Sequence, residues 1–115
     1  MLTDAPKVAA RVTFLSPNEG GRARPAVDSS EYRPHLVVGD PTQRVALTGK
    51  DGRTLIEDYL GVCFTGDERE LVPGQPHDVM LLLMYHPYVG YDALTSNASF
   101  TIREGAKIVG YGHIL

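Results

Sequence analysis

The feature that most constrains the fold is a repeated period-two pattern around a glycine turn at residues 100–115. Phe100–Arg103 alternates apolar and polar residues, as in a strand with one buried face. Gly105 follows within a charged stretch and can take the positive φ of a tight hairpin. The apolar strand then resumes, and Gly110 and Gly112 leave room for another strand to approach closely. This segment predicts a β-hairpin around which the remaining chain closes a sheet.

The rest of the chain contains further short segments of strand character separated by turns. The predicted strands are Lys7–Leu15, His35–Val38, Arg44–Thr48, Thr54–Thr65 and Asp78–Tyr85. Asp78–Tyr85 is apolar on both faces, so we expect it to be the most buried strand. Within Thr54–Thr65, the first residues also fit a helical turn, but Gly61 and the alternation that follows favour strand throughout. Six to eight short strands without a clear helix predict an all-β sandwich or barrel.

The bulk composition limits the class of protein. A length of 115 residues favours one domain, here 7–115 after an N-terminal tail at 1–6. The net charge of −3 argues against a uniformly basic nucleic-acid binder but leaves room for a local basic patch. The single cysteine, Cys63, excludes an intramolecular disulfide. With no apolar leader, and with Val79–Tyr85 too short to cross a membrane as a helix, we expect a cytoplasmic protein that does not engage a membrane.

Three short motifs occur in a characteristic order. The first is Leu15–Arg22, which contains Glu-Gly-Gly-Arg and is followed by Tyr32–Pro34, read as Tyr-Arg-Pro. The second is Val72–Gly74, which precedes the apolar strand that ends in His-Pro. The third is Phe100–Gly105, followed by Val109–Gly112. Their order and approximate spacing make the chain, from about residue 7 to its end, resemble the third, C-terminal domain of bacterial elongation factor Tu.

The resemblance implies a six-stranded antiparallel Greek-key β-barrel. In that family, the domain contacts the T stem of aminoacyl-tRNA, packs on two neighbouring domains and meets the nucleotide exchange factor. By the resemblance, Arg22, Glu104 and Gly105 match family positions at the tRNA face, and His35 falls where the family has a tRNA-contacting Gln.

This sequence also departs from the family pattern. Ala23 stands where the family has a His, and Gly39 where it has an Arg. The middle section, residues 40–71, is longer than in the family and does not align with it. The barrel is therefore better supported than tRNA binding.

A local basic patch is the main candidate site. Its members would be Arg22, Arg24 and Arg33, together with Arg103 and Lys107 of the C-terminal hairpin. Arginine suits phosphate oxygens, and Glu104 is placed to accept a hydrogen bond from a 2′-hydroxyl or a guanine amino group. The candidate binding residues are thus Arg22, Arg24, His35, Arg103, Glu104 and Gly105. The alternative is that Arg22 and Arg33 are structural and hold the loop between Glu-Gly-Gly-Arg and Tyr-Arg-Pro, with Arg33 paired to Glu19 or Glu31.

The sequence offers no catalytic site and calls for no cofactor. It lacks the Gly-x-x-x-x-Gly-Lys-Ser/Thr loop that cradles phosphates, so this chain by itself is not a GTPase. Its four histidines and Cys63 fit no familiar metal-ligand spacing. We interpret Cys63 as a small buried apolar residue, and Glu57 with Asp58 as solvated loop charge.

Two kinds of partner remain open for a non-enzymatic module. The first is a protein that normally grips the elongation factor, such as an exchange factor, a toxin or a modifying enzyme, with an immunity or decoy role as one version. The second is a tRNA-like RNA. Because the related barrel buries one side against other domains, we also expect a homodimer or a stable partner. Tyr59, Tyr88, Val89 and Tyr91 are the candidates for its exposed apolar patch.

Overall fold

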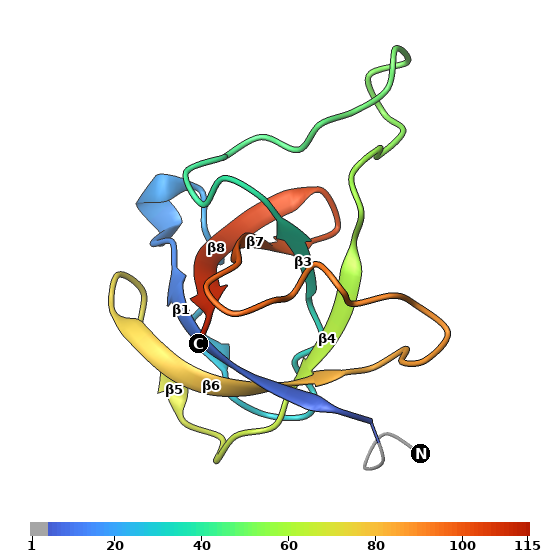
Figure 1. Cartoon of the computed structure of the whole chain (residues 1–115). Coiled ribbons are helices and arrows are strands. Elements are labelled where there is room, and N and C mark those ends of the chain that lie inside the picture. The colour runs from blue at the N-terminus through green and yellow to red at the C-terminus, as the bar shows by residue number, and fades with distance from the viewer. Residues whose placement is uncertain (1–4) are drawn as a thin grey trace.

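Six antiparallel strands close into a barrel in the computed structural model, which describes residues 5–115 (Figure 1). Around the barrel the order is β1-β6-β4-β3-β7-β8, and β8 pairs back with β1. The strands are β1 Lys7–Phe14, β3 His35–Val38, β4 Leu60–Phe64, β6 Pro76–Leu83, β7 Ser99–Glu104 and β8 Lys107–Ile114. The predicted all-β barrel is confirmed; its Greek-key connectivity and its likeness to the elongation-factor domain stay predictions.

Two small elements lie outside the barrel. The 3-10 helix η2 spans Pro17–Glu19, and β2 (Ala26–Val27) pairs with β5 (Glu70–Leu71) in a two-stranded sheet. Residues 22–34, which join η2 to β3 and are rich in polar residues, therefore contain one short strand. Of the predicted N-terminal tail, residues 1–4 lie outside the described residues. None of the helical segments in residues 5–115 has the length and apolar character needed to cross a bilayer.

The barrel interior is filled by one side-chain face of each strand. The largest buried apolar side chains of the barrel strands are Phe14, Leu36, Phe64, Leu81, Phe100 and Ile102, and Leu71 of β5 packs with them. Removing these side chains from water is the main favourable contribution to folding. Tyr32 packs against them, with its ring centroid 5.0 Å from that of Phe64 and 6.0 Å from that of Phe14.

The most buried strand is β4, so the prediction that favoured Asp78–Tyr85 is wrong. All five residues of β4 are buried, whereas β6 leaves Asp78 and Met80 exposed on its outer face. β4 is more buried than β6 because other parts of the chain cover its outer face. The ring of Tyr85 covers Gly61, and the Cys63 thiol lies 3.2 Å from a loop carbonyl, so the outer face of β4 is covered as well.

The C-terminal hairpin forms as predicted. Strands β7 and β8 pair along their length, and Gly105 has φ +61° in the turn between them. Gly112 lies so close to β1 that a Cβ there would be 2.2 Å from the carbonyl oxygen of Arg11. A side chain at this position would push β8 away from β1 and open the barrel seam. The expected close approach of another strand is therefore confirmed.

Residues 40–59, here called the arm, form the main departure from the predicted strands. Figure 1 shows the arm leaving the barrel after β3 and returning to β4, with its tip away from the barrel. The strand predicted at Arg44–Thr48 is wrong, because it contributes only one bridge, Thr48 with Leu55. Of the strand predicted at Thr54–Thr65, only Leu60–Phe64 forms.

Side chains replace strand partners along the arm. The Leu47 amide donates to the Glu57 carboxylate at 2.8 Å, and the Gln43 side-chain amide donates to the Val45 carbonyl at 2.9 Å. Asp51 accepts hydrogen bonds from the amides of Arg53 and Thr54 at the tip. Since these bonds satisfy backbone groups one by one, the alternating pattern does not become a ladder.

Candidate functional site

The first and third sequence motifs meet in one polar cluster at the β7–β8 turn, the hairpin triad of Arg22, Tyr32 and Glu104. The Arg22 guanidinium forms an ion pair with the Glu104 carboxylate and lies over the Tyr32 ring, 5.1 Å from its centroid. The Tyr32 hydroxyl donates to the same carboxylate at 2.8 Å. The ion-paired side chains are 30% and 32% exposed, so solvent reaches the pair.

Local backbone geometry places Arg22 in this triad. Gly20 takes the left-handed conformation at φ +91° after η2. A Cβ on Gly21 would lie 2.1 Å from the carbonyl oxygen of Leu15, so only glycine fits there. The Glu19 carboxylate accepts a hydrogen bond from the Ser16 amide at 3.1 Å, which holds the preceding turn. The Glu-Gly-Gly-Arg motif thus has a structural role in directing Arg22 toward Glu104.

Tyr32 remains a hydrogen-bond donor over the physiological pH range. Burial, reinforced by the hydrogen bond to Glu104, raises the pKa of its hydroxyl well above the ordinary value. Glu104 therefore accepts from two groups of the chain itself, the Tyr32 hydroxyl and the Arg22 guanidinium.

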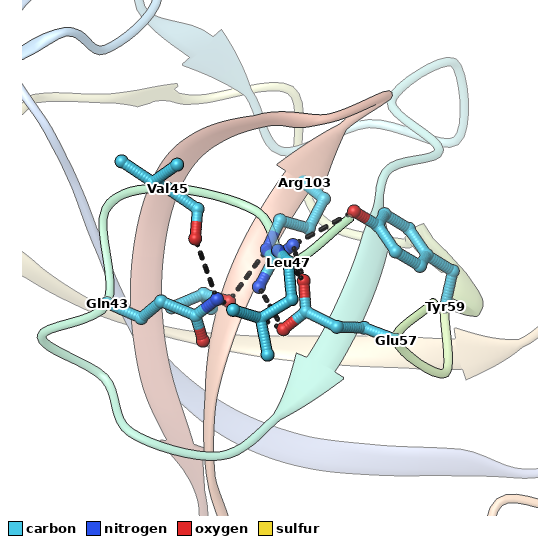
Figure 2. A network of polar contacts seen from close by, with 7 residues as sticks. Gln43, Val45, Leu47, Glu57, Tyr59 and Arg103 are labelled. Carbon is cyan, nitrogen blue, oxygen red and sulfur yellow. Dashed lines mark hydrogen bonds and ion pairs between the residues drawn. The ribbon is translucent and has the colours of Figure 1, made fainter. Parts of the chain in front are cut away.

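A second cluster of the same composition lies under the arm, the arm triad of Arg103, Glu57 and Tyr59 (Figure 2). Arg103 Nη1 donates to Glu57 Oε1 and to the Tyr59 hydroxyl, both at 2.9 Å, and Nη2 donates to Glu57 Oε2 at 3.2 Å. The guanidinium also lies 5.4 Å from the centre of the Tyr59 ring. The Arg103 side chain is 0% exposed and that of Glu57 10%. A charged guanidinium is thus wholly enclosed but fully paired.

The arm triad also ties the arm to the barrel wall. Arg103 points outward from β7, where its Nε donates to the Thr101 hydroxyl at 2.9 Å. The hydrogen bonds from Arg103, burial notwithstanding, lower the pKa of Glu57 to about 2, and hydrogen bonds from the Leu47 amide and Gln43 act in the same direction. Glu57 is therefore ionised at neutral pH and bridges Arg103 to two points along the arm.

The exposed basic patch predicted around Arg103 needs correction. Arg103 was expected to face solvent on the polar side of β7, but the arm covers that side and buries the guanidinium. Glu57, interpreted from sequence as solvated loop charge, is its buried counter-ion. A physical reason accounts for both errors: the strand pattern distinguishes the two faces of β7 but does not reveal what covers the outer one.

The remaining predicted residues are distributed around the same end of the hairpin. Gly105 and Arg24 are exposed, and the Arg24 carbonyl accepts a hydrogen bond from Arg22 Nε at 3.1 Å. His35 is half-buried and pairs with Arg103 across β3 and β7; its ring meets that of Tyr59 edge-on, with centroids 6.0 Å apart. Arg33 is exposed and donates from Nε to the carbonyl of Ser30.

The predicted apolar patch is only partly exposed. Tyr88 is 93% exposed, but Tyr91 is buried and its hydroxyl donates to the Gly61 carbonyl at 2.7 Å. Val89 packs against the core, and Tyr59 is held by Arg103. The expectation that these four residues form an exposed apolar patch is wrong, because Tyr91 is buried against Gly61, Val89 packs on the core and Tyr59 is held at Arg103.

The arm instead carries several exposed apolar side chains. Val45 is 77% exposed, Ile56 61% and Leu47 56%. The Ile56 amide donates to the Leu47 carbonyl at 3.5 Å, so these two residues are neighbours across the arm. Sequence reasoning missed this surface because the individual apolar residues resembled ordinary strand alternation.

Neither a metal-binding cluster within residues 5–115 nor similarity to a known family assigns a further function. Within residues 5–115, His, Cys, Asp and Glu side chains nowhere gather in threes with the geometry of a metal site. The sequence matches no family model and no curated protein.

Proposed function

We propose that this protein is a non-enzymatic binding module that engages a protein partner, with the arm as the main contact surface. The observation that carries the proposal is the exposed apolar group of Val45, Leu47 and Ile56 on an arm that hydrogen bonds hold in place. Exposed apolar side chains on a preorganised element are typical of protein-binding surfaces, because little ordering is required on association.

The nature of the partner is inferred from the resemblance to the C-terminal barrel of elongation factor Tu. A free-standing domain of that shape would present surfaces that the factor offers to its exchange factor, to a toxin or to a modifying enzyme. The protein would then act by mimicry, with immunity or decoy action as one form, in the cytoplasm where such partners reside. The internal pairing of Arg22 with Glu104, and of Arg103 with Glu57, supports a protein partner over RNA, because it neutralises two of the predicted phosphate-binding arginines.

RNA binding is the second candidate, favoured by the exposed Arg24 and Arg33 and by Gly105 at the hairpin turn. In that case a tRNA-like helix would contact the hairpin triad and its surroundings. Arg22 and Glu104 would have to exchange their mutual ion pair for contacts to the RNA, which lowers the expected affinity.

Parallel titrations distinguish the two candidates. The purified protein is titrated with the purified exchange factor of elongation factor Tu and, separately, with bulk tRNA at low and moderate salt. We expect micromolar or tighter binding to the exchange factor, weakened about tenfold or more in Leu47→Ser/Ile56→Ser. Val72→Ser, which changes an exposed valine outside the arm, is the matched control and should bind normally.

Two outcomes contradict the leading proposal. If tRNA binds with a strong salt dependence and Arg22→Ala/Arg24→Ala weakens it, while the exchange factor does not bind, the RNA function replaces it. If neither ligand binds, mimicry of the factor at its exchange-factor surface is excluded. Light scattering on the same samples tests the predicted homodimer, and a monomer at high concentration would argue against it.

A further inference from the structure

An open groove lies where β3 and β4 separate at the base of the arm. The pairing of β3 with β4 includes His35 and Leu36 only, whereas its pairing with β7 continues through Val38. Beyond Leu36, β3 and the end of the arm that leads into β4 diverge and enclose a groove of about 680 Å³. Its walls are Val37 and Val38 on one side and residues 56–60 on the other; Val89, Gly90 and Ala93 complete the lining.

One edge of β3 is left unpaired inside this groove. The Val62 amide donates to the Pro34 carbonyl, and the Gly39 amide donates to the Ser99 carbonyl. Because backbone groups alternate between the two edges of an antiparallel strand, the N–H and C=O of Val38 face β4. Among residues 5–115, no strand residue pairs with Val38 on that edge. The groove therefore offers the N–H and C=O of one residue, Val38, for pairing with an added strand.

The charge of the groove indicates which kind of segment would bind there. Its lining includes no Lys, Arg or His, and it does include Asp58, which is exposed and forms no ion pair within residues 5–115. The other lining carboxylate, Glu57, is neutralised by Arg103. Asp92, also exposed, adjoins the lining residue Ala93. A basic segment with apolar residues would complement this mixture of carboxylates and valines.

The geometry points to this groove as a docking site for an extended, lysine- or arginine-containing segment of a partner protein, which adds to the free edge of β3. The segment's main chain pairs with Val38, its apolar side chains contact the exposed side chains of Val38 and Ile56, and its basic side chains approach Asp58. This inference rests on the proposed protein-binding function and refines it, because it assigns the groove beside the arm and the chemistry of the bound segment.

Capped synthetic peptides provide a direct test. The probe is a peptide of about seven alternating Lys and Val residues, compared with its Glu-Val counterpart and with a version N-methylated along its backbone. Binding to the full chain is followed by amide chemical shifts in ¹⁵N–¹H spectra. We expect saturable shifts centred on Val38 and residues 56–60, and binding at least about tenfold weaker for both comparison peptides.

Variants separate this site from non-specific attraction. Asp58→Asn should weaken binding of the Lys-Val peptide by about threefold or more at low salt, whereas Glu70→Gln, which removes an exposed charge from β5, should leave it unchanged. The proposal is overturned if shifts stay absent up to about 1 mM peptide, if they lie outside the groove, or if N-methylation has no effect. Exchange-factor binding that persists in Asp58→Asn and maps elsewhere would overturn the groove alone, whereas peptide binding without exchange-factor binding would overturn only the mimicry.

Discussion

The hairpin triad and the arm triad contain the same three residue types, an arginine, a glutamate and a tyrosine, but in different surroundings. Neighbouring residues of β7 belong to each: Glu104 accepts in the first and Arg103 donates in the second. Arg22 and Glu104 keep about a third of their side-chain surface in water, whereas Arg103 is fully enclosed.

This difference in burial determines how much each triad matters. A solvent-exposed ion pair contributes roughly 0–1 kcal/mol, because water competes for both charges. In a buried pair, the loss of one partner leaves a charge without water or counter-ion, at a cost of about 3–5 kcal/mol. Identical chemistry therefore predicts unequal sensitivity to mutation, to acid and to salt.

The largest effect is expected on removing the counter-ion of Arg103. Glu57→Ala should lower the free energy of unfolding by about 3–5 kcal/mol, because the guanidinium stays enclosed without a partner. Chemical denaturation of the purified variant measures this change. Arg103→Met/Glu57→Ala, which removes both charges, should recover part of the loss; a double variant less stable than Glu57→Ala would contradict the explanation.

The second largest effect is expected from acid, which should destabilise the protein through the arm triad. The pKa of Glu57 is about 2 in the folded protein, against an ordinary value of 4.5, so the unfolded chain binds the extra proton first. The stabilisation is complete above pH 4.5 and is lost as the pH falls from there toward 2, by on the order of 2–3 kcal/mol. Urea denaturation across this range, compared with the double variant that lacks both charges, measures it. If the free energy of unfolding falls equally steeply with pH in the original protein and in the double variant, Glu57 is not the group that causes the loss of stability in acid.

A smaller effect is expected at the hairpin triad. Glu104→Gln removes the ion pair with Arg22 but keeps an oxygen that accepts from the Tyr32 hydroxyl, so the loss of stability should be about 1 kcal/mol. Thermal denaturation at low and high salt provides the measurement, since salt should narrow the gap between this variant and the original protein. If Glu104→Gln lowers the free energy of unfolding as much as Glu57→Ala does, burial does not explain a difference between the two triads.

The smallest effect is expected at Arg24, which is exposed and outside both triads. Arg24→Ala should change the free energy of unfolding by less than about 0.5 kcal/mol, because its exposed side chain lies outside both networks. The same denaturation experiment checks this. A substantial loss of stability would mean that Arg24 holds the loop that carries Arg22. Arg24→Ala would then be unsuitable as a variant for testing RNA binding.

Much of the barrel was predictable because its determinants are local. Alternation in Lys7–Leu15 indicated β1, and the glycines of the C-terminal segment indicated both its turn and the close approach of another strand, which the structure identifies as β1. The hairpin triad was partly accessible, since Arg22, Tyr32 and Glu104 all lie in the motifs that carry the resemblance. Its internal ion pair was not predicted, because no local pattern reports on residues 82 positions apart.

The arm lay beyond sequence reasoning. Arg44–Thr48 alternates like a strand, but a strand also requires a neighbour, and side chains of Gln43 and Glu57 occupy its backbone instead. The gap between β3 and β4 likewise depends on where the arm turns away from Leu60. Neither feature has a periodic signature, since both result from the path of an irregular segment.

By itself, the amino-acid sequence determined the class of fold, the turns and the inward face of the main strands, because backbone sterics and the two-residue period of a strand act over a few neighbouring residues. Tertiary structure alone decided what lies on the outer faces. The covering of Arg103, its pairing with Glu57 and the open edge at Val38 all follow from where the arm crosses the barrel. Burial and charge pairing depend on that path, because they are set by residues distant in sequence that meet only in the folded chain.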